Sequence, residues 1–263
     1  MQDHLTLIRK EFSQQADTMS KAALFNDAGI LNRIREAAQL TKQSRVLDVA
    51  CGPGIVVEAL ARTAGDVVAC DITPEMLAKT EQRCAAAGLT NVRCMPGRAE
   101  DLPFDDASFD VVVSRSALHH FLDPAAALRE MARVVRSGGR VVILDVISSE
   151  NEAEAALHNA LETLRDPSHV RMLPKSELQR VLENANLTVE TCTEWTDPRE
   201  FEDWLKITNA PERAHPLRIV MMALAGKGAT AGIGLRLDGG KILFEHAKAL
   251  TVAVKRASAM GDG

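Results

Sequence analysis

Two patterns of apolar residues alternate through the middle of the chain. Short runs in which nearly every position is apolar predict strands that are buried on both faces. Between them, apolar residues recur three or four positions apart, which is the spacing of an amphipathic helix. The predicted strands cover residues 45–50, 67–71, 92–95, 109–113, 140–146, 187–194 and 249–255. This alternation predicts an α/β fold with a Rossmann-like, doubly wound, mostly parallel seven-stranded sheet.

Helical patterns flank and interrupt this core. Leu5, Ile8 and Phe12 recur at helical spacing near the N-terminus, and a second helical segment follows, up to residue 40. The four predicted parts are a helical N-terminal extension (1–40), the Rossmann-like core (41–149), a helical insertion that includes the strand near 187–194 (150–230), and the last strand with a frayed tail (231–263).

Composition and charge argue against several classes of protein. The 263 residues include 31 basic and 36 acidic side chains, which gives a net charge of −5, and 46% of the residues are apolar. A globular protein has this composition, whereas nucleic-acid binding favours a basic excess and more aromatic residues than seven Phe and two Trp. The apolar runs are shorter than the ~20 residues that span a bilayer, and the N-terminus lacks the apolar core of a signal peptide. We therefore expect a cytoplasmic protein with neither a nucleic-acid nor a membrane partner.

The cysteines predict neither disulfides nor a metal site. They are odd in number, and no pair has CxxC spacing. They lie at Cys51, Cys70, Cys84, Cys94 and Cys192. Reduced, buried thiols explain them best. The acidic pairs at 100–101 and 105–106 are more typical of a solvated loop than of a cation site, so no metal is predicted.

A glycine-containing loop follows the first predicted strand. Gly52 and Gly54 stand where a ligand can approach the backbone at the carboxyl end of a strand. A dinucleotide fold would have a third glycine where this chain has Val57, and that glycine packs the helix close to a pyrophosphate. The loop therefore favours a nucleoside cofactor without a pyrophosphate, although a simple glycine turn is the alternative.

An acidic residue ends the second predicted strand. Asp71 lies 71 − 54 = 17 residues beyond the loop, where a carboxylate can accept hydrogen bonds from both ribose hydroxyls of a nucleoside. Asp71 could instead cap the helix that begins near Pro74.

Several segments, in order, resemble one enzyme family. They are 47–54 (LDVACGPG), 97–104 (GRAEDLPF), 108–113 (SFDVVV), 117–124 (ALHHFLDP), 128–130 (LRE) and 136–140 (RSGGR). Over residues 42–147 the chain is similar to class I S-adenosylmethionine-dependent methyltransferases, in the subgroup typified by ubiquinone and menaquinone biosynthesis enzymes (methyltransferase type 11). Residues 12–16 (FSQQA) resemble the N-terminal helix that covers the cofactor in the same group.

The resemblance implies a cofactor site. Asp48, Ala50, Gly52 and Gly54 would contact the methionine part of S-adenosylmethionine, and Asp71 would bind its ribose. The remaining implied residues are Ile72, Met76, Ala99 and Glu100 near the adenine, Ser114 at the end of the fourth strand, and Phe12 above the cofactor. Two positions depart from the family pattern: Ala50 replaces the first glycine, and Arg98 replaces an acid that often binds the adenine amino group.

Methyl transfer is an in-line displacement, in which placement of the acceptor supplies much of the rate and a base removes its proton. His119 and His120 follow the fourth strand, and either imidazole could be that base near neutral pH. His169, with Arg171, is the other candidate, where the segment could bind an acceptor carbonyl or carboxylate. The alternatives are a buried structural histidine and a capped turn.

In the resembled family, helical extensions form a lid over the acceptor, which implies an apolar or aromatic small molecule. The sequence leaves open O-, N- or C-methylation, and it also leaves open dimer contacts by the same helices. Two other functions remain: an NAD-dependent oxidoreductase on a Rossmann fold, and a non-methylating protein that binds S-adenosylmethionine.

Overall fold

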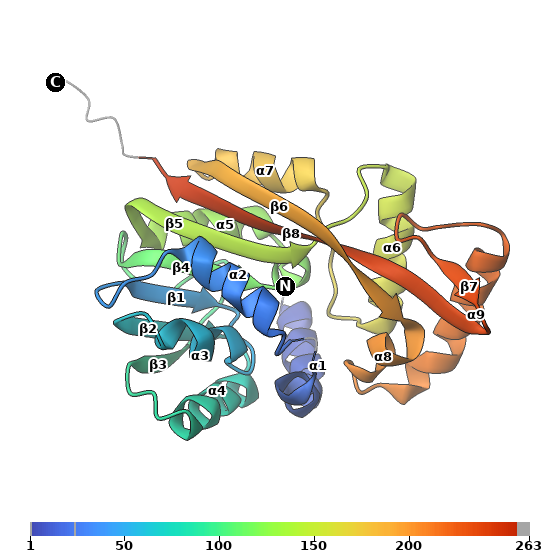
Figure 1. The fold of residues 1–263 in the computed structure, drawn as a ribbon, viewed down its shortest axis with the longest axis horizontal. Coiled ribbons are helices and arrows are strands. Elements are labelled where there is room, and N and C mark those ends of the chain that lie inside the picture. The colour runs from blue at the N-terminus through green and yellow to red at the C-terminus, as the bar shows by residue number, and fades with distance from the viewer. Residues whose placement is uncertain (1, 24, 257–263) are drawn as a thin grey trace.

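An eight-stranded sheet forms the centre of the computed structural model, which describes residues 2–23 and 25–256 (Figure 1). The strand order is β3-β2-β1-β4-β5-β8-β6, and β7 pairs with β8 beside this path. The strands are β1 (Arg45–Val49), β2 (Asp66–Asp71), β3 (Val92–Pro96), β4 (Phe109–Arg115), β5 (Val135–Val146), β6 (Leu187–Glu200), β7 (Arg236–Asp238) and β8 (Lys241–Lys255). The first five strands pair in parallel, and the pairs that involve β8 are antiparallel. This confirms a mostly parallel, doubly wound α/β core.

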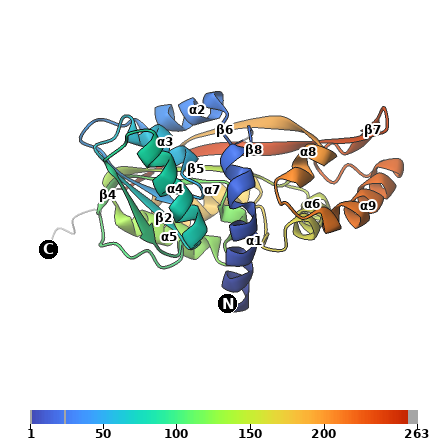
Figure 2. The ribbon, with the colours of Figure 1, turned by 90° about the horizontal axis from the view of Figure 1, so that it is seen from below.

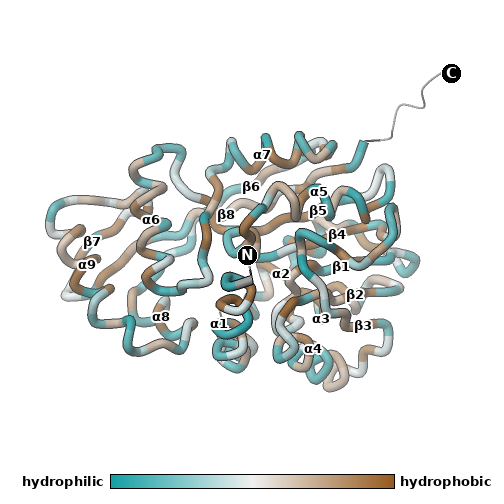
Figure 3. Tube along the Cα trace, turned by 180° about the vertical axis from the view of Figure 1, so that it is seen from behind, coloured by the Kyte–Doolittle hydropathy of each residue, from teal (hydrophilic) through white to brown (hydrophobic). Residues whose placement is uncertain are grey.

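Helices cover both faces of the sheet. They are α1 (Gln2–Lys21), α2 (Ala28–Ala38), α3 (Ile55–Ala61), α4 (Pro74–Ala86), η1 (Leu118–His120), α5 (Pro124–Val134), α6 (Glu152–Arg165), α7 (Lys175–Asn184), α8 (Phe201–Lys206), η2 (Pro211–Arg213) and α9 (Ala214–Gly226). One apolar cluster joins α5 and α7 to the sheet, and a second joins α2, α3 and α4 to its other face. Neighbouring residues of β1, Val46 and Leu47, are fully buried in opposite clusters. Because both faces of the sheet are buried, successive positions of these strands are apolar, as the sequence pattern predicts. The tube coloured by hydropathy shows brown segments through the strands (Figure 3).

A distal lobe surrounds the far end of the β6–β8 ribbon (Figure 1). It contains α6, α8, α9 and β7, and the three helices share a third apolar cluster with β8 that includes Phe201, Trp204 and Phe244. The segment predicted as a helical insertion (150–230) is thus divided: α6, α8 and α9 belong to this lobe, whereas α7 packs on the sheet of the core.

Helix α1 lies between the α/β core and the distal lobe (Figure 2). Toward the core, its Asp17 pairs with Lys79 of α4 at 2.6 Å. Toward the lobe, Glu11 forms a two-pronged ion pair with Arg213, both distances being 2.8 Å. The predicted N-terminal extension thus contacts both parts of the molecule.

The structure corrects several predicted boundaries. The sheet has eight strands rather than seven, β5 begins at Val135 rather than at residue 140, and β6 and β8 extend well beyond 187–194 and 249–255. The distal half of β8 alternates buried and half-buried positions, and two of its buried residues, His246 and Lys248, are polar. This part of β8 is therefore not a continuous apolar run, so the pattern that predicts the other strands misses it. The N-terminal 40 residues form two helices separated by a turn, and the predicted frayed tail at 257–263 lies outside the described residues.

None of the helices in the described ranges has the length and hydropathy needed to cross a membrane.

Candidate active site

The loop after β1 has the conformation that its glycines permit. Gly52 and Gly54 have φ angles of 53° and 78°, and Ala50 also adopts a positive φ, of 56°. A Cβ on Gly54 would lie 2.8 Å from the side chain of Thr80 and 2.9 Å from its Cα, whereas a Cβ on Gly52 would meet no atom within 4 Å. Gly54 is therefore required for packing, and Gly52 leaves open space beside the loop.

Asp71 holds this loop in place. Its buried carboxylate accepts a hydrogen bond from the Gly52 amide at 2.9 Å and another from the Thr73 amide at 2.8 Å. Burial raises the pKa of Asp71, and the two amide bonds partly offset that increase. Thr73, and not Asp71, is the N-cap residue of α4, so Asp71 supports the turn that leads into the helix but does not cap it. Asp71 also lines the cavity described next.

A cavity with about 990 Å³ of empty space opens at the carboxyl ends of β1, β2 and β4. Nine of the predicted cofactor residues line it: Phe12, Asp48, Ala50, Gly52, Asp71, Ile72, Met76, Ala99 and Glu100. We name it the first cavity. Two predicted residues do not line it, because Gly54 packs on Thr80 and the hydroxyl of Ser114 donates to the Val49 carbonyl at 3.0 Å.

Asp48 is a buried carboxyl in the wall of the first cavity. The residue is 1% exposed, and its Oδ2 has no hydrogen-bond partner among the described residues. Burial, reinforced by the neighbouring Asp71, raises the pKa of Asp48 to about 8. Such a group fits a ligand that brings a cationic donor, as the amino group of S-adenosylmethionine would.

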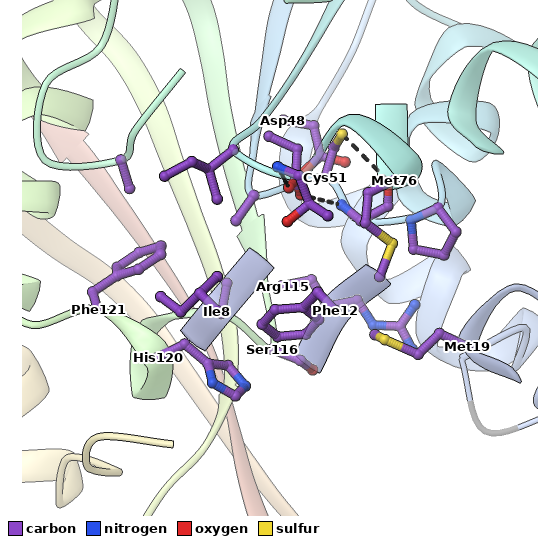
Figure 4. A pocket seen from close by; sticks show the side chains of 18 of the residues that line it. Ile8, Phe12, Met19, Asp48, Cys51, Met76, Arg115, Ser116, His120 and Phe121 are labelled. Carbon is purple, nitrogen blue, oxygen red and sulfur yellow. Dashed lines mark hydrogen bonds between the residues drawn. The ribbon is translucent and has the colours of Figure 1, made fainter. Parts of the chain in front are cut away.

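Helix α1 and the segment after β4 close the first cavity opposite the glycine loop. Figure 4 shows Ile8, Phe12 and Met19 facing Asp48, Cys51 and Met76 across the space. Further lining residues were not predicted from the sequence: Leu5, Ile8, Met19, Phe25, Arg115, Ser116 and Phe121. The helical spacing of Leu5, Ile8 and Phe12 was the available signal for the α1 contribution.

His119 forms a short contact with a buried carboxylate. Its Nδ1 lies 2.6 Å from Oδ1 of Asp145, at the end of β5, and Asp145 also accepts hydrogen bonds from the amides of Ala117, Leu118 and Val146. Burial acts to lower the pKa of His119, but the Asp145 carboxylate outweighs it, and the net pKa is raised. The Nε2 atom makes no hydrogen bond to the described residues. A carboxylate that accepts from Nδ1–H leaves Nε2 able to take a proton.

His120 and His169 have different surroundings. Nδ1 of His120 lies 3.1 Å from both the carbonyl and the hydroxyl of Ser168, and its ring packs edge-on against Phe12. Burial lowers the pKa of His120 to about 4 and that of His169 to about 3, so both are neutral near pH 7. Nε2 of His169 lies 2.8 Å from the Asn159 side-chain oxygen. Arg171 instead pairs with Glu177 at the surface and lines neither this cavity nor the next.

A second cavity, with about 750 Å³ of empty space, adjoins the first. The two share six lining residues: Phe12, Met19, Phe25, Arg115, Ser116 and His120. All three candidate histidines line the second cavity, and only His120 lines both. The structure thus brings the predicted catalytic candidates together beside the predicted cofactor residues.

Among the described residues, the wall of the second cavity contains six charged side chains, of which Arg115 also lines the first. Those in its wall are Arg115, Glu162, Arg165, Asp166, Arg199 and Lys248. They come from β4, α6, the loop after α6, β6 and β8, so their positions in the sequence are far apart. Apart from the segment 166–171, they were not predicted from the sequence, because no spacing rule links them.

Three potential metal ligands also meet in the distal lobe. One ligand atom from each of His158, Glu162 and His246 lies within 4.8 Å of the others. The helical i, i+4 spacing of His158 and Glu162 is the signal in the sequence that could have pointed to them. However, both carboxylate oxygens of Glu162 already interact, one with Arg165 at 2.9 Å and the other with the Trp204 indole at 3.2 Å. Because Arg165 supplies the positive charge here, we assign no metal to this cluster, and the absence of a metal site stays a prediction.

Comparisons with known proteins agree with this geometry. A family model described as a methyltransferase domain matches residues 47–143. The chain is 33% identical over 200 residues to YcgJ of Bacillus subtilis (strain 168), described as an uncharacterized methyltransferase, which covers 76% of this chain and 79% of that protein. The solved structure of YcgJ superposes with a TM-score of 0.81 at 30% identity, over 87% of this chain and 98% of that one.

A demethylmenaquinone methyltransferase of Mycolicibacterium vanbaalenii is 37% identical over 124 residues, which are 47% of this chain and 51% of that protein. That likeness is confined to part of each protein, whereas the likeness to YcgJ extends over most of both. On this evidence the chain belongs to the methyltransferase-domain family and is an S-adenosylmethionine-dependent methyltransferase.

Proposed function

We propose that the protein binds S-adenosylmethionine in the first cavity and transfers its methyl group to a small molecule held in the second. The observation that carries this proposal is the shared wall: Phe12, Ser116 and His120 line both cavities. Methyl transfer needs donor and acceptor to meet without water between them, and two adjoining cavities that share part of their walls support that arrangement.

The chain's own residues would hold the cofactor as follows. The open space at Gly52 admits the methionine part, and the unpartnered Oδ2 of Asp48 accepts from its amino group. Asp71 faces the ribose, while Ile72 and Met76 pack near the adenine. When bound, S-adenosylmethionine supplies a methyl group activated by its sulfonium.

His119 is the residue we assign as the base. Asp145 fixes its ring through Nδ1 and raises its pKa, which leaves Nε2 to accept the acceptor's proton. His120, whose pKa is lowered to about 4, is a poorer base and instead forms part of the shared wall. His169 is held by Asn159 and contributes to the acceptor side.

The acceptor is a small molecule with an apolar or aromatic part. Phe12, Phe25 and Trp204 offer ring faces and edges in the second cavity. An acceptor oxygen or nitrogen that loses a proton to His119 fits this wall. A cytoplasmic location and a homodimer stay predictions.

A thermal-shift titration with S-adenosylmethionine, S-adenosylhomocysteine and NAD tests the cofactor assignment. A ligand at ~100 times its Kd adds about 2.7 kcal/mol to the free energy of unfolding, which is worth roughly 5–10 °C for a chain of this size. We expect a shift with the first two compounds and none with NAD. A shift with NAD alone would favour the oxidoreductase alternative. Cofactor binding without methyl transfer across an acceptor screen would favour a non-methylating protein.

A further inference from the structure

Four polar residues lie on one face of the β6–β8 ribbon where it borders the second cavity. In the antiparallel register Asp197 is opposite His246. Arg199 and Lys248 lie two positions further along the two strands, and side chains two apart share a face. Arg199, His246 and Lys248 line the second cavity, and none of the three lines the first.

Positive charge exceeds negative charge at this end of the cavity. Arg165 is matched by Glu162 at 2.9 Å. Lys248 and Arg199, in contrast, share a single carboxylate, that of Asp197. His246 adds no negative charge, and burial lowers its pKa to about 4, so it is neutral near pH 7. The ribbon therefore presents two cations for one anion.

Arg199 is the weakly bound member of this group. Its contacts are both long, 3.4 Å from Nε to Nδ1 of His246 and 3.5 Å from Nη2 to Asp197, and Nη1 makes no hydrogen bond to any described residue. Lys248 makes the closer contact with Asp197. The Arg199 side chain is nevertheless only 13% exposed. Burial lowers the pKa of Arg199 and also that of Lys248, which shows that Asp197 only partly compensates the two charges.

We propose that the methyl acceptor carries a carboxylate, or a closely related oxyanion, that binds Arg199 with Lys248 beside it. The planar guanidinium suits a carboxylate, and its free Nη1 and long contacts leave donors for one. This inference rests on the proposed function, since it names the class of molecule that occupies the second cavity. The carboxylate of the acceptor would then bind to the β6–β8 ribbon and not to the wall that both cavities share.

Benzoate and benzamide are probes that test the proposal without knowledge of the natural acceptor. They have nearly the same shape, the ring fits the aromatic wall, and only benzoate is charged. Both are titrated by NMR into the full chain saturated with S-adenosylhomocysteine. We expect the Kd of benzoate to be at least tenfold lower than that of benzamide. Equal Kd values would overturn the proposal.

Variants assign the preference to Arg199. In Arg199→Gln we expect the ratio of the two Kd values to fall below threefold. Arg180→Gln is the matched control, because Arg180 is an exposed arginine on α7, and it should keep the wild-type ratio. A benzoate preference that survives Arg199→Gln would overturn the assignment.

Two further measurements distinguish ligand binding by Arg199 from a structural role and from failure of the cofactor site. If Arg199 serves ligand binding, the Tm of ligand-free Arg199→Gln stays at or above that of the wild type, because its long contacts are dispensable. A lower Tm with an unchanged benzoate preference would show a structural clamp and overturn the proposal. S-adenosylhomocysteine affinity, measured on the same samples, tests the proposed function on its own: normal affinity without a benzoate preference refutes only the inference, and no affinity refutes the function.

Discussion

The walls of the two cavities differ in the kinds of residues that line them. The first lies around a loop whose φ angles are positive at three positions, and its walls are largely apolar. The second is shaped by charged and imidazole side chains from strands and helices far apart in the sequence. Both cavities are assembled from distant segments, but the first contains a glycine loop that leaves a local signal in the sequence, and the charged wall of the second leaves none.

This difference decides what a substitution does in each cavity. A change in the first disturbs the loop or its carboxylates and so acts on cofactor affinity. A change in the second leaves the loop untouched and acts on the acceptor and its proton. Substitutions in each cavity therefore test whether cofactor affinity and the chemistry of the acceptor can be changed separately.

His119→Ala should lower kcat by about 10²–10⁴-fold, the usual contribution of a general base, while S-adenosylhomocysteine affinity is unchanged. Steady-state kinetics with an accepted acceptor and calorimetric titration measure the two quantities. His215→Ala, an exposed histidine on α9, is the control. Loss of cofactor affinity in His119→Ala would show that the two cavities are not separable.

The pH profile adds a second readout to this variant. His119 acts as a base only when neutral, and its pKa is raised above 6.5 by Asp145. Activity should therefore rise with pH through that raised pKa. Asp145→Asn should move this limb to lower pH, because the carboxylate that raises the pKa is gone. A limb that does not move would exclude His119 as the titrating group.

Asp71→Ala should weaken S-adenosylhomocysteine binding by about 1–3 kcal/mol, which corresponds to roughly 5–150-fold, because a buried charged acceptor is lost. Asp66→Ala is the control: it removes an acid at the other end of β2, where Asp66 pairs with Arg45 and Arg93. Calorimetry measures both affinities. Unchanged binding in Asp71→Ala would leave Asp71 with only its loop-holding role.

Gly52→Ala and Gly54→Ala should separate binding from stability. Each places an L side chain at a positive φ, which costs ~1–2 kcal/mol. Gly54→Ala also meets the backbone of Thr80, so its Tm should fall further. Gly52→Ala directs its methyl into open space, so it should lose cofactor affinity with the smaller loss of Tm. The reverse ranking would contradict the assignment of that space to the cofactor.

Binding of S-adenosylhomocysteine at pH 7 should release up to about one proton. The pKa of Asp48 is raised to about 8, so the free protein carries a protonated carboxyl at pH 7, and an ammonium group favours its ionised form. Calorimetry in phosphate and in Tris should give different apparent enthalpies, and the difference should vanish in Asp48→Asn. Identical enthalpies in both buffers for the wild type would refute the contact.

The sequence predicts features that depend on neighbouring residues, and it misses those that depend on residues far apart in the chain. Strands such as β1 and β4 are buried on both faces, and Gly52 needs a rare φ, so both left clear local signals. The polar stretch of β8 gave none, because His246 and Lys248 point into a polar cavity. The partnership of His119 with Asp145 was equally invisible, since 26 residues separate them and only the β4–β5 pairing brings them together. Neither the assignment of cofactor contacts nor that of the base is tested by the comparisons, and both stay predictions.

Helix α1 has a consequence for the turnover cycle. It supplies Phe12 to both cavities, and it is tied to the core through Asp17 and to the distal lobe through Glu11. If α1 has to move for a ligand to enter either cavity, both ligands would favour the docked helix, and we expect each ligand to raise the affinity for the other.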